Sequence, residues 1–339
     1  MKREPVTSVS LPLTIGILSV FFLSMSLGSI TPATNKMVEF YGSQGIPMTA
    51  VMYVTSLPQL ISVVGSFVAG AIAGKVLPFK TCAVIGILMI LCGGVAPFFL
   101  PQFAALLTLR MVFGAGFGFI MVLGNPLVSA FFTGSTKTKI LSISTFVTFG
   151  GAVVMQSLCG VLADMGLQYA HLTHPVAVVP LVLAAALLKE PAGQRGGRQT
   201  AARREPIPPR VFYVAAVFGL ITMFVMPAYI NLSIFVSPIS PYSTVAAVVQ
   251  VLYSVGNMFG GLCFMIQYRY CKRYSMGVSC LIMCAGLVMM LTASTLPVMC
   301  GAMLVAGFGY GGLMPASLVI TGAVTKPSQT ALATSIVFI

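Results

Sequence analysis

The feature that most constrains this chain is a succession of apolar runs, each long enough to cross a lipid bilayer. A transmembrane helix needs about 20 mostly apolar residues, and runs of that length follow one another almost without pause. Only 7% of the residues are charged and 58% are hydrophobic, whereas a soluble domain carries about 25% charged residues. The alternating segments of about ten residues that build a membrane β-barrel do not occur. The sequence therefore predicts an all-α polytopic membrane protein.

The hydropathy pattern predicts ten complete spans and the start of another. They cover residues 11–32, 48–74, 81–100, 103–132, 140–163, 175–188, 211–236, 244–267, 276–295 and 298–324, and residues 330–339 begin an eleventh. The sixth span is short as delimited, and residues 167–188 are its alternative extent. Lys2 and Arg3 precede the first span, but that span is longer than the apolar core of a signal peptide, so we expect an uncleaved helix.

Lysine and arginine gather on one side of the predicted membrane. The loops on that side hold Lys2, Arg3, Lys75, Lys80, Lys137, Lys139, Lys189, Arg195, Arg198, Arg203, Arg204, Arg210, Arg269, Lys272, Arg273 and Lys326. The loops on the other side hold Lys36 alone among these two residue types. Because cytoplasmic loops carry the excess of basic residues, we expect a cytoplasmic N-terminus in a plasma or inner membrane. The net charge of +13 thus serves orientation, and no basic stripe indicates nucleic-acid binding.

One linker divides the chain. Residues 191–210 are rich in glycine, arginine, alanine and proline and lack apolar periodicity. We therefore predict an N-terminal six-helix bundle over residues 1–190, a cytoplasmic basic linker over 191–210 and a C-terminal bundle over 211–339. The linker is interpreted as a flexible tether, and a lipid-binding basic patch is the alternative.

The two predicted bundles repeat one another. The first contains Ala-Gly-Phe-Gly-Phe at residues 115–119, and the second contains Ala-Gly-Phe-Gly-Tyr at residues 306–310. In each copy a proline follows, Pro126 or Pro315, and a Thr-Lys pair begins ten residues after it. Parallel repeats of one membrane unit are typical of secondary transporters.

Three further motifs give the chain a family resemblance. Residues 110–118 read R-x-x-x-G-x-G-x-G, residues 30–34 read Ile-Thr-Pro-Ala-Thr at the end of span one, and residues 188–191 read Leu-Lys-Glu-Pro after span six. Together with the paired bundles, these motifs resemble the major facilitator superfamily. The resemblance implies a fold of two pseudo-symmetric six-helix bundles, of which the second is incomplete here. It also implies a central cavity lined by helices 1, 4, 7 and 10, with 2, 5, 8 and 11 beside them.

Two departures from the family pattern narrow the kind of transporter that we expect. The family's loop between helices two and three carries an aspartate and a second glycine, where this chain has Gly74 and Leu77. We therefore expect the charge latch ascribed to that aspartate not to form in its usual way. Span five has Gly150 and Gly151 but no proline, so the antiporter pattern is missing. Both departures point away from drug–proton exporters.

Arg110 is the one basic residue inside a predicted span. A charge at that depth is costly and usually faces a wet cavity or a partner. We predict that it lines the substrate path, where it holds an anionic group or tunes a proton site. The alternative is a side chain that reaches the interface and binds backbone carbonyls. The other predicted path residues are polar ones at mid-depth, with interhelical hydrogen bonding as their alternative role: Gln59, Asn125, Gln156, Asn231, Tyr253, Asn257 and Tyr310.

Small residues predict close helix packing that also serves gating. Gly114 and Gly118 share one face of span four, and Gly116 lies off that face. Gly307 and Gly309 occupy the matching place in span ten. Glycines let helix backbones approach closely, and Pro126 and Pro315 are expected to kink their helices.

The sequence gives little support for proton coupling, metal or cofactor binding, or enzymatic catalysis. No acidic residue lies at mid-depth, and His171 and His174 are expected in or near a solvated external loop, so no proton-coupling group is visible. The eight cysteines form no C-x-x-C pair and no Cys/His cluster with metal spacing, so we predict no metal and no cofactor. With no nucleophile–base pair or phosphate loop, we predict that the chain is not an enzyme.

The sequence thus favours a monomeric secondary active transporter of a small organic solute or anion, embedded in the bilayer and working by alternating access. The alternative is a non-transporting membrane protein, or an inactive truncated relic of a transporter. That alternative is motivated by Ile339, which falls within the predicted eleventh span.

Overall fold

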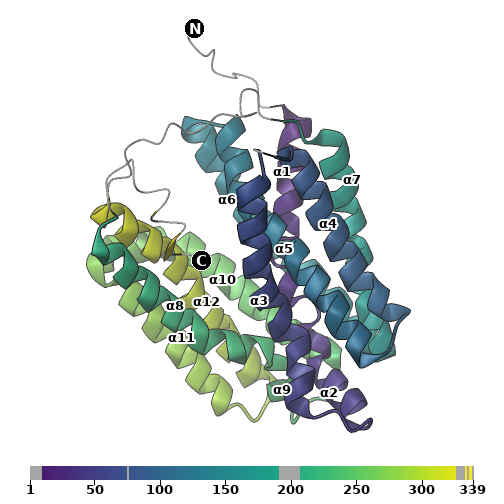
Figure 1. Cartoon of the computed structure of the whole chain (residues 1–339). Coiled ribbons are helices and arrows are strands. Elements are labelled where there is room, and N and C mark those ends of the chain that lie inside the picture. The colour runs from purple at the N-terminus through teal and green to yellow at the C-terminus, as the bar shows by residue number, and fades with distance from the viewer. Residues whose placement is uncertain (1–9, 75, 191–206, 326–332, 334–335, 338–339) are drawn as a thin grey trace. The chain divides into compact units, whose positions relative to one another are not determined.

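The computed structural model describes residues 10–74, 76–190, 207–325, 333 and 336–337 (Figure 1). The chain divides into two compact units, residues 1–198 and 199–339, and each is described by itself. Every regular element of the described part is helical, with a single isolated β-bridge between Ala73 and Leu77. The predicted all-α class is therefore confirmed.

The described part of the first unit contains seven α-helices and three short 3₁₀ turns, together with one long 3₁₀ segment. In chain order these are α1 (Leu11–Phe22), η1 (Ser26–Gly28), η2 (Thr31–Ala33), α2 (Thr34–Gly42), α3 (Met48–Ile72), α4 (Phe79–Val95), η3 (Ala96–Phe98), α5 (Phe103–Phe131), α6 (Gly134–Met165), η4 (Leu167–Ala177) and α7 (Val178–Leu187). Residues 191–206, most of the predicted linker, lie outside the described residues.

The described part of the second unit repeats the order of helices found early in the first. It consists of α8 (Pro209–Ile230), α9 (Leu232–Val236), α10 (Ser243–Cys271), η5 (Lys272–Tyr274), α11 (Ser275–Leu291) and α12 (Leu296–Val324). The predicted eleventh span, residues 330–339, lies mostly outside the described residues. In both units a long helix, a shorter helix and a second long helix follow one another: α3, α4 and α5, then α10, α11 and α12.

Eight described helical segments are long and apolar enough to cross a membrane, or nine if the bent pair of residues 11–22 and 26–42 forms one span. One of the eight, Ser243–Leu291, has 49 residues. At about 1.5 Å per residue such a segment would be far longer than the roughly 30 Å hydrocarbon core. It contains both α10 and α11, with Lys272 at φ 45° between them, and the sequence assigns it two spans.

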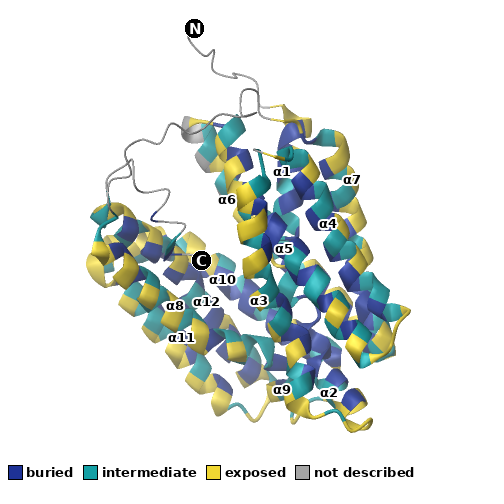
Figure 2. Cartoon of the chain, viewed as in Figure 1, coloured by how far each residue is buried: buried dark blue, intermediate teal, exposed yellow. Residues whose placement is uncertain are grey.

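Among the described helices that are each long enough to span a membrane, the second long helix of each unit has the most buried apolar window. In its most apolar window α5 is 56% buried and α12 is 50% buried, whereas α8 is only 22% buried. Figure 2 shows exposed residues along the outer helices, and large apolar side chains are among them, with Phe224 and Met265 each 78% exposed. In a membrane protein such side chains suit contact with lipid, so this exposure fits the composition.

Span one is broken, which the sequence did not predict. Helix α1 ends at Phe22, two 3₁₀ turns follow, and the helix resumes as α2 after a bend of 41°. Pro32 lies in the second turn and has no N–H to continue an α-helix. The predicted boundary at residue 32 is wrong, because helical structure continues to Gly42.

Glycines set the closest helix contacts, in the same way in both units. A Cβ atom built on Gly114 or Gly118 would overlap the backbone of α3, and one on Gly116 would overlap the backbone of α4. A Cβ on Gly307 would likewise overlap α10, and one on Gly309 would overlap α11. The repeated motif therefore holds the same pair of backbone contacts in each unit.

In the loop between α3 and α4, where the family carries an aspartate, the backbone turns at Gly74 and a distant carboxylate binds the start of α4. Gly74 has φ +72°, a conformation that favours glycine, and its N–H donates to the Leu77 carbonyl oxygen at 2.7 Å. The carboxylate of Glu190 accepts the backbone N–H of Phe79 at 3.1 Å and that of Lys80 at 2.7 Å. A negative group at a helix N-terminus is favourable, so a carboxylate from the end of span six caps α4.

Candidate functional site

Arg110 lies entirely inside the first unit, seven residues after the start of α5 at Phe103. Its Nε–H donates to the carbonyl oxygen of Val54 in α3 at 3.2 Å, and its guanidinium carbon lies 4.3 Å from the centre of the Phe113 ring. The terminal nitrogens Nη1 and Nη2 are buried and have no hydrogen-bond partner among the described residues. The alternative interpretation predicts a side chain that reaches the membrane interface and binds backbone carbonyls. The hydrogen bond to Val54 agrees with the second part of it, but a side chain with 0% exposure does not reach the membrane interface.

The two histidines of the sixth span are buried beside Arg110. His171 is 4% exposed and His174 is 0% exposed, and both lie within electrostatic range of the Arg110 charge. The expectation that they are solvated in an external loop is wrong. The reason is that the alternative extent of span six holds: residues 167–177 form η4, which packs against α4 and α6 and carries both rings inward.

The break in span one supplies a partner for one of these histidines. The Nδ1 of His174 lies 3.0 Å from the His171 carbonyl oxygen, so this nitrogen must carry the proton. The Nε2 of a neutral ring is then the acceptor for the Ser29 hydroxyl at 3.1 Å. The Phe113 ring, which already contacts Arg110, meets the His174 ring edge-on at 5.2 Å. Residues from the broken segment, α5 and η4 are thus joined in one buried cluster.

The other predicted path residues of the first unit are not gathered around Arg110. Gln59 is partly exposed next to Pro58, and Asn125 and Pro126 are exposed. Gln156 in α6 is fully buried. The helices α5 and α12 run without interruption through Pro126 and Pro315, and the predicted kinks stay predictions.

In the second unit the structure brings together two of the predicted residues and one more. The rings of Tyr229 and Tyr253 lie 4.9 Å apart, and those of Tyr253 and Tyr310 lie 6.2 Å apart. These three tyrosines, from α8, α10 and α12, form what we call the tyrosine cluster. The hydroxyl of Tyr253 is buried and has no hydrogen-bond partner in the described part of the chain.

Amides lie close to the tyrosine cluster. Gln250 Nε2 donates to the Tyr229 carbonyl oxygen at 3.4 Å, and Asn231 Nδ2 donates to the Pro227 carbonyl oxygen at 2.9 Å. Asn257, one turn after Tyr253, is 7% exposed, and its backbone faces Gly311. Sequence reasoning missed Tyr229 and Gln250, although Tyr229 lies on a helix predicted to line the cavity and Gln250 on one predicted to lie beside it.

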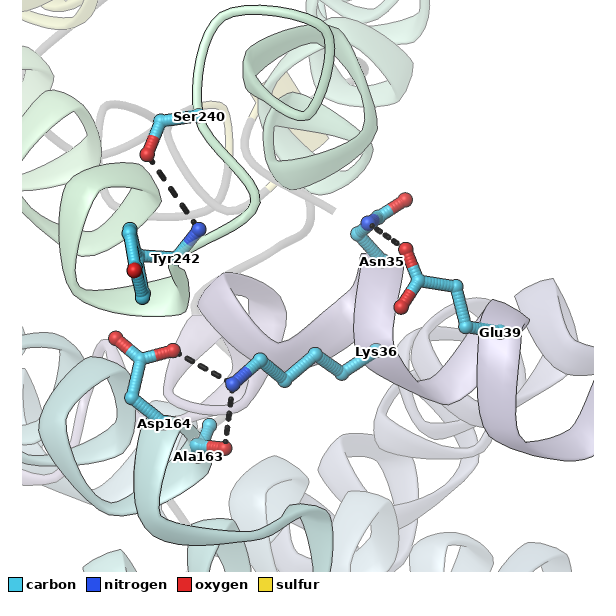
Figure 3. A network of polar contacts seen from close by, with 7 residues as sticks. All are labelled: Asn35, Lys36, Glu39, Ala163, Asp164, Ser240 and Tyr242. Carbon is cyan, nitrogen blue, oxygen red and sulfur yellow. Dashed lines mark hydrogen bonds and ion pairs between the residues drawn. The ribbon is translucent and has the colours of Figure 1, made fainter.

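An ion pair joins α2 to α6 in the first unit (Figure 3). Lys36 Nζ lies 2.7 Å from the carboxylate of Asp164 and also donates to the Ala163 carbonyl oxygen at 2.9 Å. It ties α2, the second helical part of span one, to the last turn of α6. The sequence showed Lys36 as the isolated basic residue of its side but did not identify its partner. Among the described residues, no group of three potential ligands could hold a metal ion.

The fold defines the class of the protein: a polytopic α-helical membrane protein of two units with repeated helix packing. The sequence model of the Major Facilitator Superfamily matches residues 16–339. The chain therefore belongs to the Major Facilitator Superfamily. No curated protein matches the sequence significantly.

Solved transporters share the fold. A mutant of the nucleoside transporter NupG aligns with a TM-score of 0.75 at 10% identity, covering 97% of this chain and 87% of that one. A D-xylose–proton symporter aligns with a TM-score of 0.68 at 13% identity, covering 99% and 87%. A mutant of the peptide transporter POT in complex with sulfate gives 0.69 at 13% identity, again covering 99% and 87%. At these identities the likeness shows the fold alone.

Proposed function

We propose that this chain is a secondary active transporter of a small organic solute or anion that works by alternating access, as a monomer in a plasma or inner membrane with its N-terminus cytoplasmic. Family membership supports transport. The repeated glycine contacts support the mechanism, because they make each trio of helices a tightly packed body, and bodies of this kind rock as units in such transporters.

The observation that carries the proposal furthest is the tyrosine cluster with its unpartnered hydroxyl. A buried hydroxyl without a partner is unfavourable, and the Tyr253 ring that carries it lies between two other tyrosine rings, on helices that the family fold places in or beside the substrate cavity. A solute with a hydrogen-bond acceptor and an apolar or ring face would bind the Tyr253 hydroxyl and pack against the tyrosine rings. Arg110 remains a proposed path residue, as do Gln59, Asn125, Gln156, Asn231 and Asn257.

Transport by the full-length chain in liposomes tests the proposal. The first panel of labelled solutes is set by the structural neighbours: nucleosides, pentoses and short peptides, extended to small carboxylates. We expect saturable uptake, accelerated when unlabelled solute is present inside the liposomes, since exchange is characteristic of alternating access. If no solute in a broad panel binds or crosses, the chain is better explained as a non-transporting membrane protein.

Two variants locate the solute site. Tyr253→Phe removes only the unpartnered hydroxyl, so we expect KM to rise by about tenfold, as for one lost hydrogen bond to substrate. Tyr268→Phe is the matched control, because Tyr268 lies on the same helix with its ring against Phe264 and is 40% exposed. Arg110→Ala is expected to impair transport, and unchanged transport would remove Arg110 from the mechanism.

A further inference from the structure

Three unusual features of the first unit meet in its interior. The broken segment of span one has its first 3₁₀ turn, η1, against α3, α5 and α6. The η4 segment is an 11-residue 3₁₀ run, whereas such runs rarely exceed about four residues and often mark functional hinges. Arg110 projects from α5 into the same region. Irregular backbone at membrane depth is tolerated only inside protein or around a cavity.

The charge of Arg110 is not balanced by the described residues. The described carboxylates are those of Glu39, Asp164 and Glu190, and each is engaged elsewhere: with Asn35, with Lys36 and with the start of α4. The Nε of the guanidinium donates a hydrogen bond to a backbone carbonyl, and the buried Nη1 and Nη2 have no hydrogen-bond partner among the described residues. A buried charge in this state is strongly unfavourable unless something pairs with it.

Three other polar groups of the first unit are also buried without a hydrogen-bond partner among the described residues. The hydroxyls of Ser26 and Thr34 and the Nδ1 of His171 are buried and unpartnered within the described part of the chain. Ser26 belongs to the broken segment, Thr34 begins α2, and His171 belongs to η4. Hydroxyl groups can each donate a hydrogen bond, whereas the Nδ1 of a neutral His171 ring accepts one, because the other ring nitrogen already donates to the Gly94 backbone. A buried guanidinium without a countercharge, with hydroxyl donors on the broken segment and on α2, which both pack against α3, suits an anion and repels a cation.

We infer that the interior of the first unit is a binding site for a small monovalent anion, with Arg110 as the countercharge and the Ser26 hydroxyl as a donor. The chemistry is that of a halide ion or of the carboxylate of a small solute. Arg110 has no exposed surface, so the anion reaches it when the broken segment or η4 moves. The site is distinct from the tyrosine cluster, and binding to it requires no transport.

Equilibrium binding tests the site on the purified full-length chain in detergent. Thermal unfolding is followed in sodium isethionate buffer while chloride or acetate replaces isethionate at constant ionic strength. We expect a saturable rise in the unfolding midpoint, since a ligand that binds the folded state stabilises it. Ser26→Ala should weaken the apparent Kd by about tenfold, the loss of one charge-assisted hydrogen bond.

Arg110→Met is the decisive variant. It should abolish the response to anion, and without anion it should unfold at or above the wild-type temperature, because it removes an unpaired buried charge. Arg273→Gln is the matched control, since Arg273 is exposed, and it should keep the full response. Line broadening of the chloride NMR signal by the wild-type protein, reversed by acetate, provides a measurement that depends on no variant.

The outcomes separate the sources of the anion. A response to chloride alone would identify the ligand as a halide ion. A response to acetate alone would identify it as the carboxylate of a solute. A response to both would mean that the site recognises the negative charge and not the shape of the anion. The inference is overturned if neither anion shifts the midpoint or broadens the signal, or if Arg110→Met responds as the wild type does. Such a result would leave the proposed transport activity standing, because that activity is measured by uptake.

Discussion

Individual residues in this protein act through partners that lie far away in the sequence. Glu190 caps a helix that begins at residue 79, Lys36 pairs with Asp164, and Ser29 binds His174. Each side chain is ordinary in its own segment and acquires its role only when packing brings the partner within about 3 Å. For this reason residue-level roles were predicted less well than the helices that carry them.

The cap on α4 can be tested by removing its charge. Glu190→Gln should lower the free energy of unfolding by about 0.3–1 kcal/mol, the usual value of a charge at a helix N-terminus. Unfolding of the purified protein in denaturant measures the effect. Glu39→Gln is the control, because Glu39 is exposed near the C-terminal end of α2. An equal loss in both variants would show that the carboxylate at residue 190 has no capping role.

The Lys36–Asp164 pair is expected to be weak in spite of its 2.7 Å distance. Both side chains are partly exposed, at 24% and 19%, and exposed ion pairs contribute about 1 kcal/mol or less. A double-mutant cycle with Lys36→Met and Asp164→Asn measures the coupling. A coupling energy several times larger would mean that the pair is shielded from water, as in a closed external gate.

At the scale of elements, the sequence identified the glycine faces correctly but not what they contact. Helical geometry alone places Gly114 and Gly118 on one face, because residues four apart lie one above the other. That this face meets α3, while Gly116 meets α4, required the packed structure. The break in span one was missed for a different reason: residues 23–33 are apolar or small enough to continue a span, and hydropathy does not register hydrogen bonding.

Two glycines of α12 provide a matched test of close packing. A Cβ on Gly307 would overlap the backbone of Tyr253, whereas one on Gly301 meets nothing within 4 Å. Gly307→Ala should therefore destabilise the protein by about 1–3 kcal/mol, as overpacking does. Gly301→Ala should be neutral or stabilise by up to about 1 kcal/mol, from helix propensity. Equal effects in a thermal unfolding assay would contradict the close contact of α10 and α12.

At the scale of the whole molecule, the basic residues make a prediction about orientation. With the eight native cysteines replaced, Ser43→Cys should react with a membrane-impermeant maleimide in intact cells, because its loop lies opposite the basic loops. Arg273→Cys should react only after the cells are permeabilised. The reverse pattern would place the N-terminus outside and invert the assignment of every loop.

The sequence by itself determined that this is a membrane protein of repeated apolar helices and that it belongs among transporters. Those properties follow from the length of apolar runs and the spacing of small residues, which are local features that any fold of the chain must satisfy. Only the tertiary structure decided that His171 and His174 are buried near Arg110, that span one breaks after Phe22, and that Tyr253, with its unpartnered hydroxyl, lies between the rings of two other tyrosines. These arrangements depend on packing between helices that are distant in sequence, and neither hydropathy nor motif spacing contains that information.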